Sequence, residues 1–120
     1  REHYIDNAAV QGEYLLAKLE ELYKYPIVGD VRGKGLMCGI EFVRDKTTKE
    51  PFETKQNIKG KITEYCLERG IVPYPGGGSA DGVRGDHIQI TPPITISREE
   101  VDILISALDA AIKQVCDELR

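Results

Sequence analysis

Apolar residues near the C-terminus recur every three or four positions, a spacing typical of an amphipathic helix. This helix is expected to begin after Ser97, because Ser97 and Glu100 have the spacing of a capping box, in which each side chain accepts a hydrogen bond from a backbone N–H. A short strand from His87 to Thr91 is predicted upstream, and Pro92 and Pro93 end it because proline has no N–H for a sheet. The apolar face of the helix comprises Val101, Leu104, Ile105, Leu108, Ala111, Ile112 and Val115.

Two further stretches have the spacing of helices. The first runs from about Tyr4 to Lys24 and is ended by Pro26. Thr54 is predicted to cap a second helix that reaches Arg69, with Gly70 in the following position, where a left-handed backbone closes a helix. The buried side of this second helix is expected to contain Ile58, Ile62, Tyr65 and Cys66.

The segments between these helices are predicted to form strands. Two extended runs flank the motif Arg32–Gly35, and apolar residues alternate with others from Leu36 to Val43, as in a strand with one buried face. Ile71 and Val72 are expected to start a short strand, which Pro73 and Pro75 limit. The order helix, strand, strand, helix, strand, loop, strand, helix predicts an α+β fold. We expect one domain, residues 1–120, built as a two-layer sandwich with helices packed on a small, mainly antiparallel sheet.

The stretch from Tyr74 to Asp86 lacks a periodic pattern and is rich in glycine. Long irregular loops in compact domains are uncommon and often functional. Gly76–Gly78 is interpreted as a flexible loop, with a loop that moves over a site as the alternative. Arg84 is either a solvated surface side chain or a clamp for a carboxylate, whose geometry the guanidinium fork matches. Asp86 and His87 could instead orient the loop through hydrogen bonds.

The motif Arg32–Gly35 resembles a phosphate-binding loop only in its letters. Such loops need a helix N-terminus after the glycines, and here a strand follows. We therefore expect a glycine turn in which Arg32 pairs with a carboxylate. The residues show no set that combines a nucleophile with a base.

Composition narrows the class of protein. The 120 residues are 41% hydrophobic and 30% charged, as in an ordinary globular domain. A net charge of −4 argues against a nucleic-acid partner, and no apolar run approaches the ~18 residues that predict a membrane span. Three widely spaced cysteines favour reduced, buried thiols in a cytoplasmic protein. With two histidines and no CxxC or HxxxH pair, no metal site is expected.

The first residues suggest a piece of a larger protein. The chain starts with REHYIDNAAV, which has no initiator Met and no capping residue before its first helix. We expect that it was excised from a longer polypeptide. A free-standing α+β ligand-binding or regulatory module, the alternative, would instead be expected to begin with Met and a capped helix.

Two stretches of sequence are distinctive, VGDVRGKGLMCGIEFV from Val28 and GDHIQITPPITISREEVD from Gly85. Together they resemble the C-terminal small domain of class III aminotransferases, which are fold-type I enzymes that use pyridoxal 5'-phosphate. The similarity extends to NAAVQGEYLLAKLEEL and LERGIVPYPGG, and so covers nearly the whole chain. It implies a transaminase that moves an amino group between an amine or ω-amino acid and a 2-oxo acid, built as a homodimer. A glutamate-1-semialdehyde-type aminomutase is the alternative within the same family.

The resemblance also assigns residues to the site. It places the Schiff-base lysine, the aspartate on the pyridine nitrogen and the phosphate-binding residues in the large domain, which is absent from this chain. No catalytic, cofactor-binding or metal-binding residue is therefore expected here. Many members have a carboxylate-binding arginine three residues before the first proline, where this chain has Gln89. Some members that act on amines or ω-amino acids use a mobile arginine in the preceding loop, which Arg84 matches. Arg84 and Gln89 are the predicted substrate-binding residues.

Overall fold

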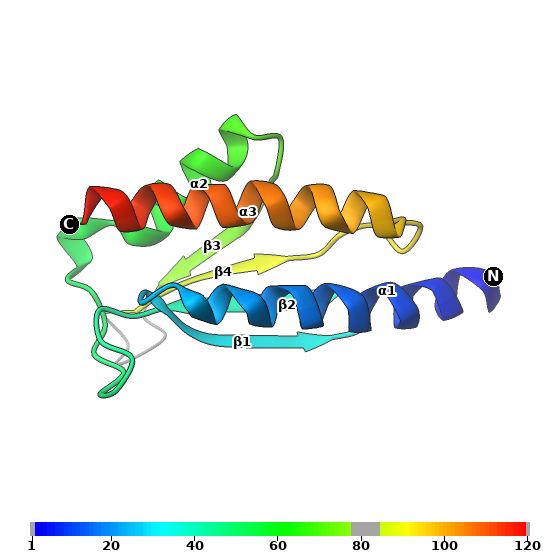
Figure 1. Ribbon diagram of the computed structural model, residues 1–120, viewed down its shortest axis with the longest axis horizontal. Helices are drawn as coiled ribbons and strands as arrows, with labels where there is room; N and C mark the ends of the chain where they lie inside the picture. The colour runs from blue at the N-terminus through cyan, green and yellow to red at the C-terminus, as the bar shows by residue number, and fades with distance from the viewer. Residues whose placement is uncertain (1, 78–84, 120) are drawn as a thin grey trace.

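The computed structural model describes residues 2–77 and 85–119, and it has two layers. Helices cover one face of an antiparallel sheet whose strand order is β1-β2-β4-β3 (Figure 1). The strands are β1 (Val28–Lys34), β2 (Met37–Phe42), β3 (Tyr74–Gly77) and β4 (Asp86–Ile90). The helices are α1 (Glu2–Glu20), α2 (Ile58–Glu68) and α3 (Arg98–Glu118), with 3-10 turns η1 (Glu21–Lys24) and η2 (Thr54–Gln56). This arrangement confirms the predicted α+β sandwich.

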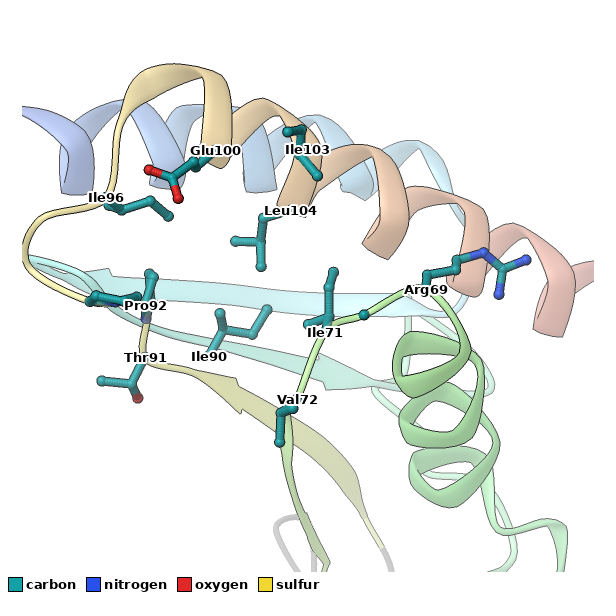
Figure 2. A pocket seen from close by; sticks show the side chains of 12 residues that line it. Arg69, Ile71, Val72, Ile90, Thr91, Pro92, Ile96, Glu100, Ile103 and Leu104 are labelled. Atoms are coloured by element: carbon teal, nitrogen blue, oxygen red, sulfur yellow. The ribbon is translucent and has the colours of Figure 1, made fainter.

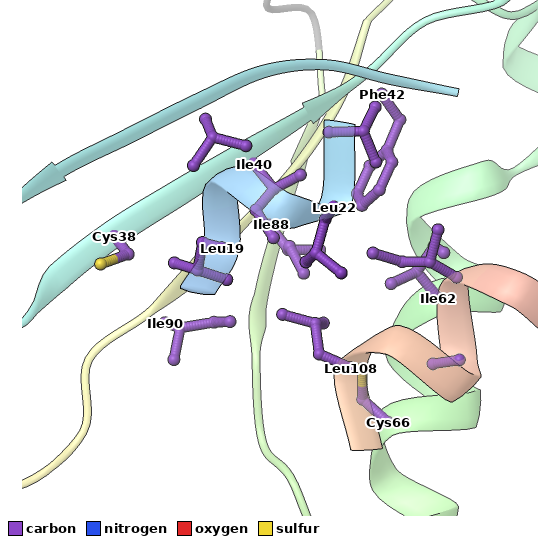
Figure 3. Close-up of a cluster of buried hydrophobic side chains, with 14 of the residues drawn as sticks. Leu19, Leu22, Cys38, Ile40, Phe42, Ile62, Cys66, Ile88, Ile90 and Leu108 are labelled. Atoms are coloured by element: carbon purple, nitrogen blue, oxygen red, sulfur yellow. The ribbon is translucent and has the colours of Figure 1, made fainter. Parts of the chain in front are cut away.

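The core lies between the sheet and the helices. Alternate residues of β2, namely Cys38, Ile40 and Phe42, point into it and are at most 2% exposed. They meet the apolar stripe of α1 and side chains from α3 (Figure 3). The long helices α1 and α3 run side by side in the same direction across the sheet (Figure 1). Other fully buried side chains are Leu15, Leu19, Leu22, Ile58, Ile62, Ile88, Leu108 and Ile112.

The predicted start of the last helix is confirmed. The N–H of Glu100 donates to Ser97 Oγ over 3.1 Å, and the N–H of Ser97 donates to Glu100 Oε1 over 3.0 Å. The hydrogen bond from the Ser97 backbone lowers the pKa of the Glu100 carboxyl. Because this pKa is lowered in the folded state, the hydrogen bond contributes to the stability of the fold above the usual carboxyl pKa. That stability is lost as the pH falls through the lowered value.

Replacing Ser97 by alanine should therefore destabilise the fold. The variant Ser97→Ala leaves an N–H at the start of α3 without its acceptor, which typically costs ~1 kcal/mol. For a domain of this size the melting temperature should fall by roughly 3–6 °C, measured by circular dichroism. Ser106→Ala, an exposed change in the middle of the same helix, serves as the control. Equal melting temperatures for the two variants would contradict the capping role.

The second helix begins later than the sequence predicted. Thr54 does not cap it, because Thr54 is the first residue of the 3-10 turn η2, which Glu53 and Gln56 close with their own capping box. Asn57 then adopts a left-handed conformation with φ 49°, and α2 starts at Ile58. The short turn separates Thr54 from the orphan N–H groups of α2, so its hydroxyl cannot satisfy them.

The end of the same helix is as predicted, but the strand after it is not. Gly70 has φ +83°, and its N–H donates to Leu67 O while the N–H of Ile71 donates to Cys66 O. These two bonds form a Schellman motif, which occupies the Ile71 N–H in closing the helix. The expected strand at Ile71–Val72 is therefore wrong, and β3 starts at Tyr74. The interpretation of Gly76 and Gly77 as loop is wrong for the same strand, because both pair with β4.

The cysteines are structural. Cys38, Cys66 and Cys116 are free and buried, as the sequence indicated. Burial raises the pKa of the Cys38 and Cys66 thiols to about 11, so neither forms the reactive thiolate near neutral pH. Among the described residues, no helix combines the length and apolarity needed to cross a bilayer.

Candidate functional site

The sheet has a second face that the helices do not cover, here called the outer face. Because side chains alternate along a strand, residues between the buried positions point to it. Its side chains are those of Asp30, Arg32, Lys34, Met37, Glu41, His87 and Gln89, with Gly39 and Gly76 between them. Polar and charged groups predominate in this set, in contrast to the apolar inner face.

Strand register arranges the outer face in rows that cross the sheet. In one row, Gly39 of β2 lies opposite Arg32 of β1 on one side and Gln89 of β4 on the other. In the next row, Glu41 lies between Asp30 and His87. Chain segments that are distant in sequence thus bring a guanidinium, a carboxylate pair, an imidazole and an amide onto one surface.

Arg32 is held by acidic neighbours on this face. Its Nε lies 2.9 Å from Asp30 Oδ2, and its Nη2 lies 3.5 Å from Glu41 Oε2. This confirms the expectation that Arg32 pairs with a carboxylate. The Arg32 side chain is 70% exposed, and ion pairs at such exposure contribute only about 0–1 kcal/mol. The side chain can therefore exchange partners at little cost.

Asp86 and His87 were expected to orient the loop before β4, whose residues 78–84 lie outside the described ones, and the structure gives both residues contacts of another kind. The His87 ring lies over Gly76, where a Cβ would overlap it, and its Nδ1 is buried without a hydrogen-bond partner among the described residues. Asp86 is 5% exposed, and its Oδ1 accepts the backbone N–H of Lys59 over 3.0 Å. Asp86 thus supplies from β4 the N-terminal cap that α2 lacks locally, and fixes this helix to the sheet.

A hollow of about 370 Å³ opens on the outer face above Gly39. Gly39 forms its floor because it has no side chain, and a Cβ there would approach only Ile88 O, at 3.8 Å. Among the described residues, the charged side chains that line it are those of Arg32 and Lys34, and His87 and Gln89 add further polar groups. Such a lining can accept an anion and donate hydrogen bonds to it.

Of the two predicted substrate-binding residues, one lies among the described residues and the other does not. Gln89 is exposed on β4 and lines the hollow. Arg84 lies outside the described residues. Sequence reasoning treated Arg32 and Lys34 as parts of a turn and missed that both share the face of Gln89. Their spacing of two residues within an extended run was the signal available, since it places both on one side of a strand.

A second cavity of about 420 Å³ lies on the helix side, between the start of α3 and the end of β4 (Figure 2). Its walls are largely apolar, with Ile71, Ile90 and Leu104 turned inward and Arg69 at the rim. Glu100, the carboxylate among the described residues that line it, is already engaged in the capping box of α3. This groove suits apolar contact, and the outer-face hollow is the better candidate for binding a polar substrate.

The described residues do not fit a pyridoxal phosphate site. A Schiff-base lysine is activated in a desolvated pocket, and every described lysine is exposed or only partly buried. Likewise, no cluster of three His, Cys, Asp or Glu in the described part of the chain could hold a metal ion. What these residues offer is a polar hollow on the outer face.

Comparison with known proteins fixes the family. The family model described as Aminotransferase class-III matches residues 1–112. The chain belongs to this family. An uncharacterized aminotransferase of Schizosaccharomyces pombe is 42% identical over 113 residues, covering 93% of the chain and 25% of that protein. The hypotaurine/taurine–pyruvate aminotransferase of Paracoccus denitrificans is 33% identical, covering 95% of the chain and 24% of that protein.

Solved structures agree with the family assignment. A thermostable (S)-enantioselective omega-transaminase from Thermomicrobium roseum superposes with a TM-score of 0.82 at 41% identity, covering 95% of this chain and 24% of that one. The chain therefore spans about a quarter of the length of the class-III relatives that it matches.

Proposed function

We propose that the chain is the C-terminal small domain of a pyridoxal-phosphate-dependent class-III transaminase. The enzyme would move an amino group between an amine or ω-amino acid and a 2-oxo acid. The observation that carries this proposal is the family match across residues 1–112, combined with a polar hollow that contains Gln89. The omega-transaminase similarity supports the choice of amines and ω-amino acids as donors.

The cofactor and the catalytic lysine would lie in a large domain outside this chain. Two observations support this: every described lysine is exposed or only partly buried, and the chain covers about a quarter of the solved omega-transaminase. The large domain would be the chain's direct partner, and we propose a homodimer for the whole enzyme. The aminomutase and the free-standing module gain no support, since the relatives named above are aminotransferases and a transaminase.

Gln89 suits a cleft that must hold different substrates in succession. A transaminase binds one substrate in each half-reaction, and one of the two can lack a carboxylate. A buried arginine would then be left as an unpaired charge, at a cost of several kcal/mol. The neutral Gln89 amide can donate a hydrogen bond to a carboxylate oxygen without incurring that cost when the carboxylate is absent.

The isolated 120-residue chain should fold but should not transaminate. Its described helices and strands enclose an apolar core, whereas a desolvated lysine is absent from the described residues. We expect a cooperative melting transition, no amino transfer from an amine to pyruvate, and no borohydride-trappable adduct with pyridoxal phosphate at one specific lysine. The full-length protein should show both activity and the adduct. A saturable adduct on the isolated chain would refute the assignment of the catalytic lysine to the large domain. A full-length protein without transamination would refute the proposed function.

A further inference from the structure

Met37 and Cys38 are consecutive sulfur-containing residues of β2 that face opposite sides of the sheet. Because side chains alternate along a strand, one of the two sulfurs points outward and the other points into the core. Met37 is 60% exposed, whereas Cys38 is 2% exposed and belongs to the buried cluster beneath the helices (Figure 3). The two sulfurs therefore lie in different environments although they are neighbours in the sequence.

The hairpin between β1 and β2 fixes the outward position of Met37. Lys34 and Met37 form the last cross-strand pair of this hairpin. The turn between them consists of Gly35, which has φ +59°, and Leu36, which is buried in the core. Helix α1 supports the turn from the inner side, since a Cβ on Gly12 would overlap the Gly35 carbonyl. Met37 is thus exposed on a well-packed element.

The other sulfur atoms of the chain are poorly placed to react with an oxidant. The chain has one methionine and three cysteines. Cys66 and Cys116, like Cys38, are buried free thiols. Thiols react as thiolates, and burial raises the pKa of Cys38 and Cys66 to about 11. A thioether has no proton to lose before it reacts. Met37 is therefore the sulfur most open to oxidation.

We propose that Met37 is a reversible oxidation site that changes the polarity of the outer-face hollow. The oxidant is a hydroperoxide such as hydrogen peroxide. The Met37 sulfur attacks one peroxide oxygen with a lone pair, and the O–O bond breaks as the S–O bond forms. The leaving hydroxide takes the proton from the new S–OH group and departs as water. The sulfur is oxidised to a sulfoxide and the peroxide is reduced. Methionine sulfoxide reductases reverse this modification.

The sulfoxide oxygen gains a hydrogen-bond donor across the strands. Lys34 lies directly opposite Met37, and Cβ atoms of such pairs are about 5 Å apart. Lys34 is exposed and forms no ion pair with the described residues, so its ammonium group can turn to the new oxygen. Both residues line the hollow. Oxidation therefore replaces an apolar wall by a polar oxygen and engages one of the cations of this lining.

The effect on catalysis rests on the proposed transaminase function, in which the hollow receives the substrate. The thioether of Met37 offers an apolar contact to the hydrocarbon part of an amine donor, and the sulfoxide removes it. Losing a contact the size of one methylene group, ~0.8 kcal/mol, corresponds to about a 4-fold rise in KM. Because the contact is made equally before and during the reaction, kcat should change by less than about 2-fold.

The modification is tested on the 120-residue chain, which has a single methionine. Hydrogen peroxide is added at neutral pH, in buffer and in guanidinium chloride, and the oxidised residue is located by fragmentation mass spectrometry. Met37 should gain one oxygen atom at rates that differ by less than about 3-fold between the two conditions, because folding leaves it exposed. Cys38, the internal control, should react at least ~10-fold more slowly in buffer than in denaturant. Protection of Met37 by folding, or faster oxidation of Cys38 in buffer, would overturn the proposal.

The contact with Lys34 has its own test. The ¹³Cε signals of the lysines are followed by NMR before and after oxidation of the same chain. The Lys34 signal should move and should return after treatment with methionine sulfoxide reductase. The Lys24 signal should stay in place, because this lysine is paired with Asp109 through Nζ at 3.1 Å and lies outside the hollow. An unmoved Lys34 signal would show that the sulfoxide does not engage this cation.

The full-length enzyme tests the effect on the substrate, with butylamine as donor and pyruvate saturating. Peroxide should raise KM for butylamine by about 4-fold, and the reductase should restore it. Met37→Leu keeps an apolar wall without an oxidisable sulfur, so its KM should be the same before and after peroxide. If the parent and Met37→Leu respond alike, the proposed change of the hollow is wrong. If Met37 is oxidised but the full-length protein does not transaminate, the proposed function fails and the oxidation site stands.

Discussion

Replacing Gly12 by alanine should destabilise the fold by about 2 kcal/mol, although alanine is the better helix former. A Cβ on Gly12 would overlap the carbonyl of Gly35, in the turn that joins β1 to β2. This obstacle is backbone, so it cannot rotate away as a side chain would. Overpacking of this kind costs up to ~3 kcal/mol, and alanine regains only about 1 kcal/mol through helix propensity. We expect the melting temperature to fall by roughly 6–12 °C.

The control for Gly12 is Gly39→Ala. The Cβ of that variant would meet only Ile88 O, at 3.8 Å, which is an ordinary contact. Its melting temperature should stay within about 2–3 °C of the parent, since surface changes usually alter stability by less than about 0.5 kcal/mol. If Gly12→Ala melts at the parent temperature, α1 does not approach the turn as closely as described.

Features that depend on neighbours in the sequence were predictable. The capping box at Ser97, the left-handed Gly70 and the proline stop after β4 each involve residues within a few positions of one another. Their chemistry is therefore visible in the sequence itself. The alternation in β2 was equally clear, because its inner residues are buried and apolar while its outer residues are not.

Features that depend on distant partners were not predictable. The cap of α2 comes from Asp86, 27 residues beyond the N–H that it binds, so the nearby Thr54 was a misleading candidate. The glycines of β3 have no strand propensity and belong to the sheet only because β4 pairs with them. In both places tertiary contact overrides the local preference of the residues.

The same distinction applies to the site. The sequence singled out Gln89 as a candidate because it lies three residues before the first proline. It did not show which residues lie beside Gln89 across the sheet. Arg32 and Gly39 join it through strand register, which links positions 32, 39 and 89. A sequence pattern fixes which face a residue occupies, whereas register fixes what lies beside it. The hollow is a product of the second.

Arg84→Ala in the full-length enzyme should lower kcat/KM for the 2-oxo-acid partner by at least ~30-fold. Arg84 lies outside the described residues, and its role is proposed from its position between two glycines just before β4. We propose that it pairs with the carboxylate of the oxo acid in one half-reaction and turns to water in the other. Losing one partner of a desolvated charge pair costs roughly 2–5 kcal/mol, and 2 kcal/mol corresponds to about 30-fold.

The control substrate is a donor without a carboxylate. Arg84→Ala should change kcat/KM for such an amine by less than ~5-fold, about 1 kcal/mol, because no charge pair is lost in that half-reaction. Equal losses for amine and oxo acid would make Arg84 a structural residue. If neither substrate is affected, Arg84 is a solvated surface side chain, and another residue must bind the oxo-acid carboxylate.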